Sequence, residues 1–134
     1  NVVMSSFLEE IDDCLSAGYQ VVQGLRASRN PEDNWVTRLD DAAEAVAFLE
    51  QRGRVRLGLS ARLSGSAMAF SASFFQAAGG WQATCISETM EFIILAALNG
   101  FRVGWCPSAV AYDEKVSSAA ELFGQRQMSQ SWPE

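Results

Sequence analysis

Glu88–Leu98 reads ETMEFIILAAL, and its apolar residues lie almost all round a helix. The apolar positions are Phe92, Ile93, Ile94, Leu95 and Leu98. A helix with apolar residues on every side is typical of a buried element. We therefore expect other parts of the fold to enclose this helix, with Asn99-Gly100 ending it.

Other helices are expected on both sides of this stretch. Residues 5–17 place Phe7 and Ile11 at helical spacing, opposite a group of acidic side chains, and Gly18 is expected to end that helix. Further helices are expected over residues 35–51, over residues 71–78 after a Ser71 cap, and from Ser117 or Ser118 to about residue 128.

The helix expected over residues 35–51 has a long apolar stripe. Its members are Leu39, Ala42, Ala43, Val46 and Leu49. Such a stripe is typical of a helix that packs on the core of a domain. Gly53 is expected to end this helix.

Short β-rich segments alternate with the helices. We expect strands over residues 19–23, 55–59, 66–70, 103–105 and 109–112, with Pro107 separating the last two. No linker rich in Pro, Gly or Ser divides the chain. The pattern predicts one α/β domain over residues 1–134, with a mixed sheet flanked by helices.

The composition excludes several classes of protein. Apolar residues make up 49% of the chain and charged residues 19%, which fits a folded core better than disorder. The net charge is -6, from 16 acidic and 10 basic residues, so nucleic acid is not an expected partner. The basic residues concentrate only at Arg52, Arg54, Arg56 and Arg62, which we interpret as a solvated strand face beside a loop.

Cysteine and histidine usage limits the possible chemistry. The chain has no histidine, which excludes histidine-ligated zinc and a Ser-His-Asp triad within it. Cys14, Cys85 and Cys106 are far apart and form no Cys-x-x-Cys pair, so we expect buried or free thiols in a reducing compartment, the cytoplasm. No apolar run approaches the ~18 residues of a membrane-spanning helix. Because Asn1 is not a methionine, we expect the chain to be part of a longer protein.

Two carboxylates stand at the start of the apolar helix. Glu88 and Glu91 are three residues apart, so they share one face of the first turn. One interpretation is structural, since Ser87 is a good N-cap and acidic residues stabilise a helix N-terminus. The other is that one carboxylate removes a proton from an acceptor hydroxyl.

Two further groups of residues could bind a ligand. Gly79-Gly80-Trp81 allows a close backbone approach and offers an aromatic face for a sugar, or it is a turn with a buried tryptophan. Gln125-Arg126, with Trp132, could donate hydrogen bonds to a phosphate, or could be an exposed helix end.

The order and spacing of these segments resemble the second half of a family 2 inverting glycosyltransferase. The resembling segments are Phe7-Leu8, Val21-Val22-Gln23-Gly24, Arg29-Asn30-Pro31, Gly65-Ser66-Ala67-Met68-Ala69-Phe70, Gly79-Gly80-Trp81, Ser87-Glu88-Thr89-Met90-Glu91-Phe92, Asn99-Gly100-Phe101-Arg102-Val103-Gly104-Trp105, Pro107-Ser108-Ala109-Val110-Ala111-Tyr112-Asp113-Glu114 and Gln125-Arg126. The resemblance covers nearly the whole chain. It implies a partial GT-A fold and transfer from a nucleotide sugar, such as a UDP-sugar, to a saccharide or lipid-linked acceptor.

The resemblance also implies a position within the longer family domain. Family members hold a divalent metal, Mg²⁺ or Mn²⁺, with an Asp-x-Asp motif, and Asn1-Val2-Val3 resembles the residues that follow it. The chain would then be the acceptor-side, C-terminal portion, without a metal site of its own. In the family this domain works in the cytoplasm, including at the cytosolic face of a membrane.

Site residues follow from the same resemblance. Glu88, Thr89 and Glu91 would mark the base region, Gly80 and Trp81 the acceptor site, and Gln125 and Arg126 the donor phosphates. Thr89 stands where the family has its catalytic Asp, and a threonine hydroxyl is not basic near neutral pH. Met128-Ser129 stand where the family has Arg-Trp. The isolated chain is therefore expected to be inactive.

A second hypothesis is a binding module without catalysis. A sheet without its neighbouring strands exposes an edge, which favours self-association into a homo-oligomer. The sequence alone leaves this alternative open.

Overall fold

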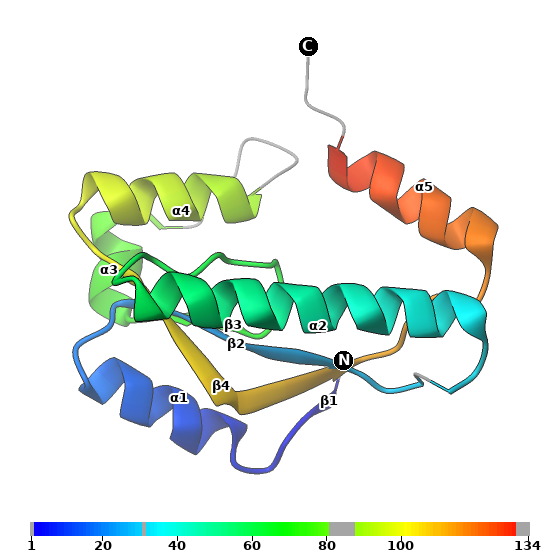
Figure 1. Ribbon diagram of the computed structural model, residues 1–134. Helices are drawn as coiled ribbons and strands as arrows, with labels where there is room; N and C mark the ends of the chain where they lie inside the picture. Colours follow the sequence, from blue (N-terminus) through cyan, green and yellow to red (C-terminus); the bar gives the residue numbers. More distant parts are fainter. Residues whose placement is uncertain (1, 31, 81–87, 131–134) are drawn as a thin grey trace.

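The computed structural model describes residues 2–30, 32–80 and 88–130 of the chain, and Figure 1 shows their arrangement. The described residues form both helices and strands. In chain order they are β1 (Val2–Val3), α1 (Phe7–Ser16), β2 (Val21–Ser28), α2 (Trp35–Arg56), β3 (Met68–Phe70), α3 (Ala72–Ala77), α4 (Glu88–Leu98), β4 (Val103–Asp113) and α5 (Ala119–Gln130). None of the described helices is both long enough and apolar enough to cross a membrane.

The strands form one mixed sheet in the order β1-β4-β2-β3. The central strands β2 and β4 are parallel, and the edge strands β1 and β3 pair antiparallel with β4 and β2. Because β2 and β4 are parallel, their carboxyl ends meet at one edge of the sheet. This architecture confirms the expected α/β class, with a mixed sheet flanked by helices.

Strand β4 is continuous, so the expected division into two strands at Pro107 is wrong. Gly24 pairs with Cys106 and the next residue, Leu25, pairs with Val110. The intervening residues of β4 form an irregularity that accommodates the proline without ending the strand. Strand β2 likewise runs past Gly24, where the sequence interpretation had ended it.

Gly24 lies at the tightest part of this irregularity. A Cβ atom on Gly24 would lie 2.6 Å from the backbone oxygen of Ala109 and 2.9 Å from that of Ala67. Only glycine leaves room for both backbone segments, because a methyl group would overlap two atoms that cannot rotate away.

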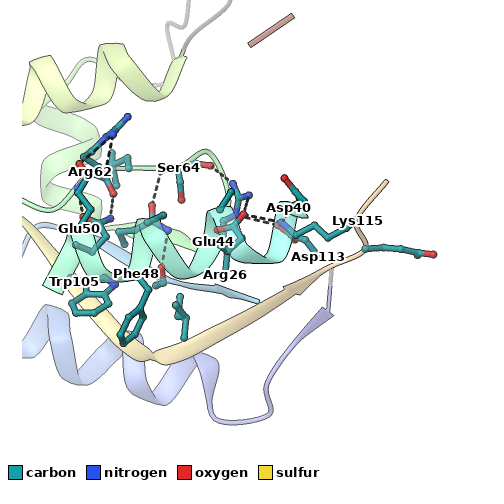
Figure 2. A pocket seen from close by; sticks show the side chains of 18 of the residues that line it. Arg26, Asp40, Glu44, Phe48, Glu50, Arg62, Ser64, Trp105, Asp113 and Lys115 are labelled. Atoms are coloured by element: carbon teal, nitrogen blue, oxygen red, sulfur yellow. Dashed lines mark hydrogen bonds and ion pairs between the residues drawn. The ribbon is translucent and has the colours of Figure 1, made fainter. Parts of the chain in front are cut away.

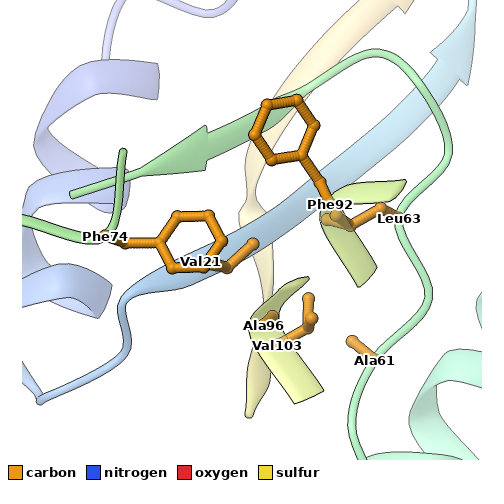
Figure 3. Packing of buried hydrophobic residues seen from close by; sticks show 7 residues of the cluster. All are labelled: Val21, Ala61, Leu63, Phe74, Phe92, Ala96 and Val103. Carbon is orange, nitrogen blue, oxygen red and sulfur yellow. The ribbon is translucent and has the colours of Figure 1, made fainter. Parts of the chain in front are cut away.

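The sheet separates two apolar clusters. Val21 points into one cluster and Val22 into the other, because successive side chains of a strand face opposite sides. Figure 3 shows the first cluster, which α3 and α4 cover; its buried members are Val21, Ala61, Leu63, Phe74, Phe92, Ala96 and Val103. Helix α1 covers the second cluster, with Phe7 and Ile11 against Val22 and Cys106. Ser71 caps α3 as expected, since its hydroxyl accepts the Phe74 N–H at 3.1 Å.

Helix α4 has the expected bounds but not the expected burial. Phe92 and Ala96 are buried against the first cluster. Ile94 is 54% exposed and Leu98 is 78% exposed, so only one side of the helix meets the core. The expectation of burial on every side is therefore wrong for the described part of the fold.

Helix α2 extends through the segment that was expected to be a strand. Its N-terminus is capped by Asn34, whose Oδ1 accepts the Val36 N–H at 2.8 Å, while Asn34 N–H donates to Thr37 Oγ1 at 3.1 Å. Gly53 lies inside the helix rather than ending it, because an interior glycine costs only about 1 kcal/mol relative to alanine. The expected strand over residues 55–59 is wrong: Val55 continues the helix and the chain turns at Gly58.

The apolar stripe of α2 faces away from the sheet. Leu39 is 56% exposed, Val46 65% and Leu49 63%. Thr37 is buried, and Glu44 and Phe48 line a cavity beside the sheet. The expectation that the stripe packs on the core is therefore wrong. The side that approaches the sheet carries the groups that pair with charged residues of the strands.

Candidate functional site

Gln23 fixes the loop that precedes β3. Its side chain is buried; Nε2 donates to the backbone oxygen of Ser66 at 2.9 Å, and Oε1 accepts the Ser64 N–H at 2.9 Å. The Gly24 N–H donates to the backbone oxygen of Ala67. Ala67 itself has a positive φ of 53°, an uncommon conformation for a residue with a side chain. The loop therefore has one defined path beside β2.

This path brings Gly65 against the first turn of α4. Gly65 has a φ of 78°, and a Cβ atom on it would lie 3.5 Å from Thr89 Oγ1. Two segments far apart in the sequence thus meet at Thr89. Because Gly65 has no side chain, the loop can pass close to the hydroxyl of Thr89.

A cavity of about 580 Å³ lies between α2 and the sheet, as Figure 2 shows. Its walls come from the middle of α2, the loop before β3, the middle of β2 (residues 23–26), Trp105 near the start of β4, and residues 113–116 at the end of β4 and just beyond it. The volume falls within the usual range for small-molecule sites.

Five of the charged side chains that line this cavity form one cluster of ion pairs. Lys115 Nζ lies 2.8 Å from Glu44 Oε1 and 3.3 Å from Asp40 Oδ2. Arg26 also pairs with Glu44, and its Nε lies 3.5 Å from Asp113 Oδ2. Lys115 is almost fully buried, so the carboxylates of α2 provide the compensation that a buried ammonium requires.

The charged cluster is connected to the loop that faces Thr89. Arg26 Nη1 donates to the backbone oxygen of Ser64 at 3.0 Å, and Ser66 Oγ donates to Asp113 Oδ2 at 3.2 Å. Arg26 Nε and Asp113 Oδ1 are buried without a hydrogen-bond partner. Helix α2, both central strands and the loop therefore form one polar network.

Two aromatic rings line the same cavity. Phe48 of α2 and Trp105 of β4 meet edge to face, with ring centroids 5.1 Å apart. Apolar ring surface beside carboxylate, guanidinium and amide groups is the combination that binds sugars, whose faces are apolar and whose edges carry hydroxyls.

The family model described as Glycosyl transferase family group 2 matches residues 1–128. The chain belongs to this family. A comparison with curated proteins found no match to this sequence.

In this glycosyltransferase chain, only some of the expected site residues can be placed in full. Thr89 and Glu91 lie on the first turns of α4, whereas of Glu88 the structure describes only the helical backbone. Gly80 follows α3 with a φ of 80°, and a Cβ on it would lie 3.9 Å from Phe75 Cε1. Trp81, the Ser87 cap and Trp132 lie outside the described residues. Gln125 and Arg126 lie on α5, with side chains outside the described part.

The described residues of this glycosyltransferase chain do not fit a divalent metal. They hold no group of three or more His, Cys, Asp or Glu side chains arranged to bind one. The carboxylates of Asp40, Glu44 and Asp113 are instead engaged by Lys115 and Arg26. No catalytic step is therefore derived through a metal in these residues.

The sequence interpretation missed the charged cluster. Asp40 and Glu44 are four residues apart and so share a helix face, which was a usable signal. Arg26 was not predicted to lie at the site, because the strand expected over residues 19–23 ends before it, whereas β2 extends to Ser28. Lys115 follows the resembling segment that ends at Glu114, and nothing in its neighbours predicts burial.

Proposed function

We propose that the chain is the acceptor-side part of an inverting GT-A-type domain that transfers a sugar from a nucleotide sugar, expected to be a UDP-sugar, to an acceptor hydroxyl. The observation that carries this proposal is the family match over residues 1–128, together with the loop at Gly65 that lies against Thr89. The open cavity between α2 and the sheet reaches Ser64 of that loop, which gives a saccharide room to lie beside it.

In an inverting transfer, the acceptor oxygen attacks the anomeric carbon of the donor sugar directly. The acceptor O–H proton passes to a base, the new C–O bond forms, and the bond to the diphosphate breaks with its electron pair leaving on the phosphate. The base must be a carboxylate or an equally basic group. Thr89 cannot serve, so Glu88 and Glu91 are the carboxylates of this turn that could.

We propose further that transfer by this chain alone is absent or very slow. The threonine at position 89 replaces the acid that the resemblance places there. A divalent metal, which in the family offsets the charge of the leaving diphosphate, has no suitable ligand group in the described residues. Trp81, Gly80, Gln125 and Arg126 remain proposed acceptor and donor contacts.

Acceptor binding can be tested by nuclear magnetic resonance of the ¹⁵N-labelled chain. Soluble oligosaccharides are expected to shift the amide signals of Gly65 and Thr89. Glu91→Gln is expected to weaken this binding about tenfold, if a charged hydrogen bond to the sugar is lost. Glu121→Gln, on the exposed first turn of α5, is the matched control and should leave the affinity unchanged.

Donor binding needs a separate measurement. Calorimetry with a UDP-sugar and Mn²⁺ should give no binding heat, and a transfer assay should give no product. A clear heat of binding or a transfer product would contradict the inactivity. Failure of every oligosaccharide to move Gly65 and Thr89 would instead overturn the acceptor-side assignment.

Self-association through a sheet edge remains a prediction. The described edge strands β1 and β3 have two and three residues, which offers few backbone groups for pairing with another copy.

A further inference from the structure

Two alanines of α2 leave space between this helix and the sheet. Ala43 and Ala47 line the cavity together with Glu44 and Phe48, and their spacings of one, three and four residues put all four on one face of the helix. A methyl group fills little of the gap between a helix and a sheet, so a larger side chain at either alanine would extend into the cavity. The cavity therefore depends on small residues at these two positions.

The charged side chains around the cavity are mostly acidic. Among the described residues that line it, five are acidic and three are basic, which gives the lining a net charge of -2. The acidic residues are Asp40, Glu44, Glu50, Asp113 and Glu114, and the basic residues are Arg26, Arg62 and Lys115. A concave surface lined mainly by one sign of charge concentrates the electrostatic potential of that sign. The potential inside the cavity is therefore negative.

The three basic side chains of the lining are already paired with carboxylates. The pairs are Lys115 with Asp40 and Glu44, Arg26 with Glu44 and Asp113, and Arg62 with Glu50. An anionic ligand would have to displace a carboxylate from its cation and then remain close to that carboxylate. Glu114 is exposed at the cavity and lies outside these pairs, so it adds further repulsion.

A neutral sugar finds suitable partners in the same lining. An ionised carboxylate only accepts hydrogen bonds and has about four sites for them, so a carboxylate that is already ion-paired can still accept from a sugar hydroxyl. The rings of Phe48 and Trp105 supply apolar surface for the C–H face of the sugar. An uncharged ligand can make both kinds of contact without disturbing an ion pair.

We propose that this cavity binds an uncharged sugar unit of the acceptor and excludes anionic ligands, both uronic acid units and the diphosphate of the donor. The inference rests on the proposed function and narrows the acceptor to saccharides that carry no negative charge on this unit. Because the cavity reaches Ser64, the residue before Gly65, the bound unit lies beside the loop that contacts Thr89. The donor diphosphate then binds outside this cavity.

Nuclear magnetic resonance of the ¹⁵N-labelled chain can separate the cavity from the loop. The indole N–H signal of Trp105, identified by its loss in Trp105→Phe, reports on the cavity, and the amides of Gly65 and Thr89 report on the loop. Short oligosaccharides of glucose, mannose and galactose are the neutral probes. The same chains with each hydroxymethyl group oxidised to a carboxylate are the anionic probes.

The two kinds of probe should differ in affinity at low salt. At least one neutral oligosaccharide should shift the Trp105 signal, and its oxidised counterpart should bind at least about tenfold more weakly, because like charges in a binding site repel. High salt should reduce this difference, since salt screens the repulsion. UDP, which carries the diphosphate without a sugar, should leave the Trp105 signal in place.

A pair of leucine variants tests the volume of the cavity. Ala47→Leu should weaken binding of the neutral oligosaccharide about tenfold or more, because the new side chain occupies the cavity. Ala42→Leu, on the exposed apolar stripe of α2, is the matched control and should leave the affinity unchanged. Both positions are exposed, and leucine is a good helix former, so circular dichroism should show the wild-type helix content for both variants.

A pair of charge variants tests the electrostatic exclusion. Glu114→Lys changes the net charge of the lining from -2 to zero and should tighten binding of the oxidised oligosaccharide about fivefold. Asp12→Lys makes the same charge change at an exposed position of α1, on the other side of the sheet from α2 in Figure 1, and should leave the affinity unchanged.

The outcomes separate this inference from the proposed function. Shifts of Gly65 and Thr89 without a shift of Trp105, or equal affinities for neutral and oxidised probes, would overturn the inference and leave the proposed function standing. A shift of Trp105 by UDP would assign the cavity to a nucleotide and would also overturn the inference. If no oligosaccharide moves any of the three signals, the proposed function fails and the inference fails with it.

Discussion

Lys115 Nζ lies 2.8 Å from Glu44 Oε1 and so joins the segment that follows β4 to the middle of α2. The two residues are 71 positions apart in the sequence. This ion pair and the neighbouring pair between Lys115 and Asp40 orient α2 on the sheet. Most amphipathic helices are oriented instead by the packing of an apolar face.

Removal of the lysine should therefore destabilise the protein strongly. Lys115→Met leaves two carboxylates on α2 without their ammonium partner, and the free energy of unfolding should fall by about 3 kcal/mol. Urea denaturation measures the change. Arg38→Gln breaks the ion pair with Glu32, in which both side chains are well exposed, and should cost at most about 0.5 kcal/mol. Equal losses of unfolding free energy in the two variants would show that the buried ion pairs stabilise the fold no more than an exposed pair does.

Two glycine-to-alanine substitutions should have opposite effects. Gly24→Ala places a methyl group 2.6 Å from the backbone oxygen of Ala109, so unfolding should become easier by about 2 kcal/mol or more. Gly53→Ala lies inside α2 with nothing within 4 Å of the new Cβ, and should stabilise the protein by about 0.5–1 kcal/mol. Thermal denaturation of both variants shows whether each one raises or lowers stability. A Gly24→Ala protein as stable as the wild type would argue against the close approach of Gly24 to the backbone of Ala109 and Ala67.

Polar substitutions in the exposed apolar stripe of α2 should leave the fold intact. Val46→Asn and Leu49→Gln change side chains that are mostly exposed, so each should alter the free energy of unfolding by less than about 1 kcal/mol. Phe92→Ala removes a buried α4 side chain from the first apolar cluster, and the free energy of unfolding should fall by about 3–5 kcal/mol. Chemical denaturation of the three variants measures these changes in the free energy of unfolding. A large loss from Leu49→Gln would mean that the stripe faces the core after all.

Stability should fall in alkaline solution because of Cys14. Burial, and then its hydrogen bond with Cys106, raises the pKa of the Cys14 thiol from 9.0 to about 12. The unfolded chain therefore loses this proton at lower pH than the folded chain, and the associated stability is present below pH 9.0 and lost as the pH rises towards 12. The urea midpoint of the wild type should fall across this range by more than that of Cys14→Ala, and identical pH profiles would exclude the effect.

The sequence by itself determined the class of fold and much of its local structure. Helical spacing around Phe7 and Ile11 fixed α1, and the Ser71 cap marked α3, because both depend on residues close together in the chain. The order of short motifs identified the glycosyltransferase family, which the match over residues 1–128 supports. These features need no knowledge of the neighbours of each helix.

The tertiary structure decided which side of α2 faces the sheet. Periodicity shows which residues share a helix face, but not which face points inward, and the apolar stripe with Leu49 at its end was assigned to the wrong side. The deciding charges come from Arg26 and Lys115, which approach α2 only when β2 and β4 pair in parallel. The antiparallel pairing of β2 with β3, together with the hydrogen bond from the Ser64 N–H to Gln23 Oε1, places the loop at Gly65 beside Thr89. Contacts between distant segments determine both results, because no local pattern encodes the free energy of burying those charges.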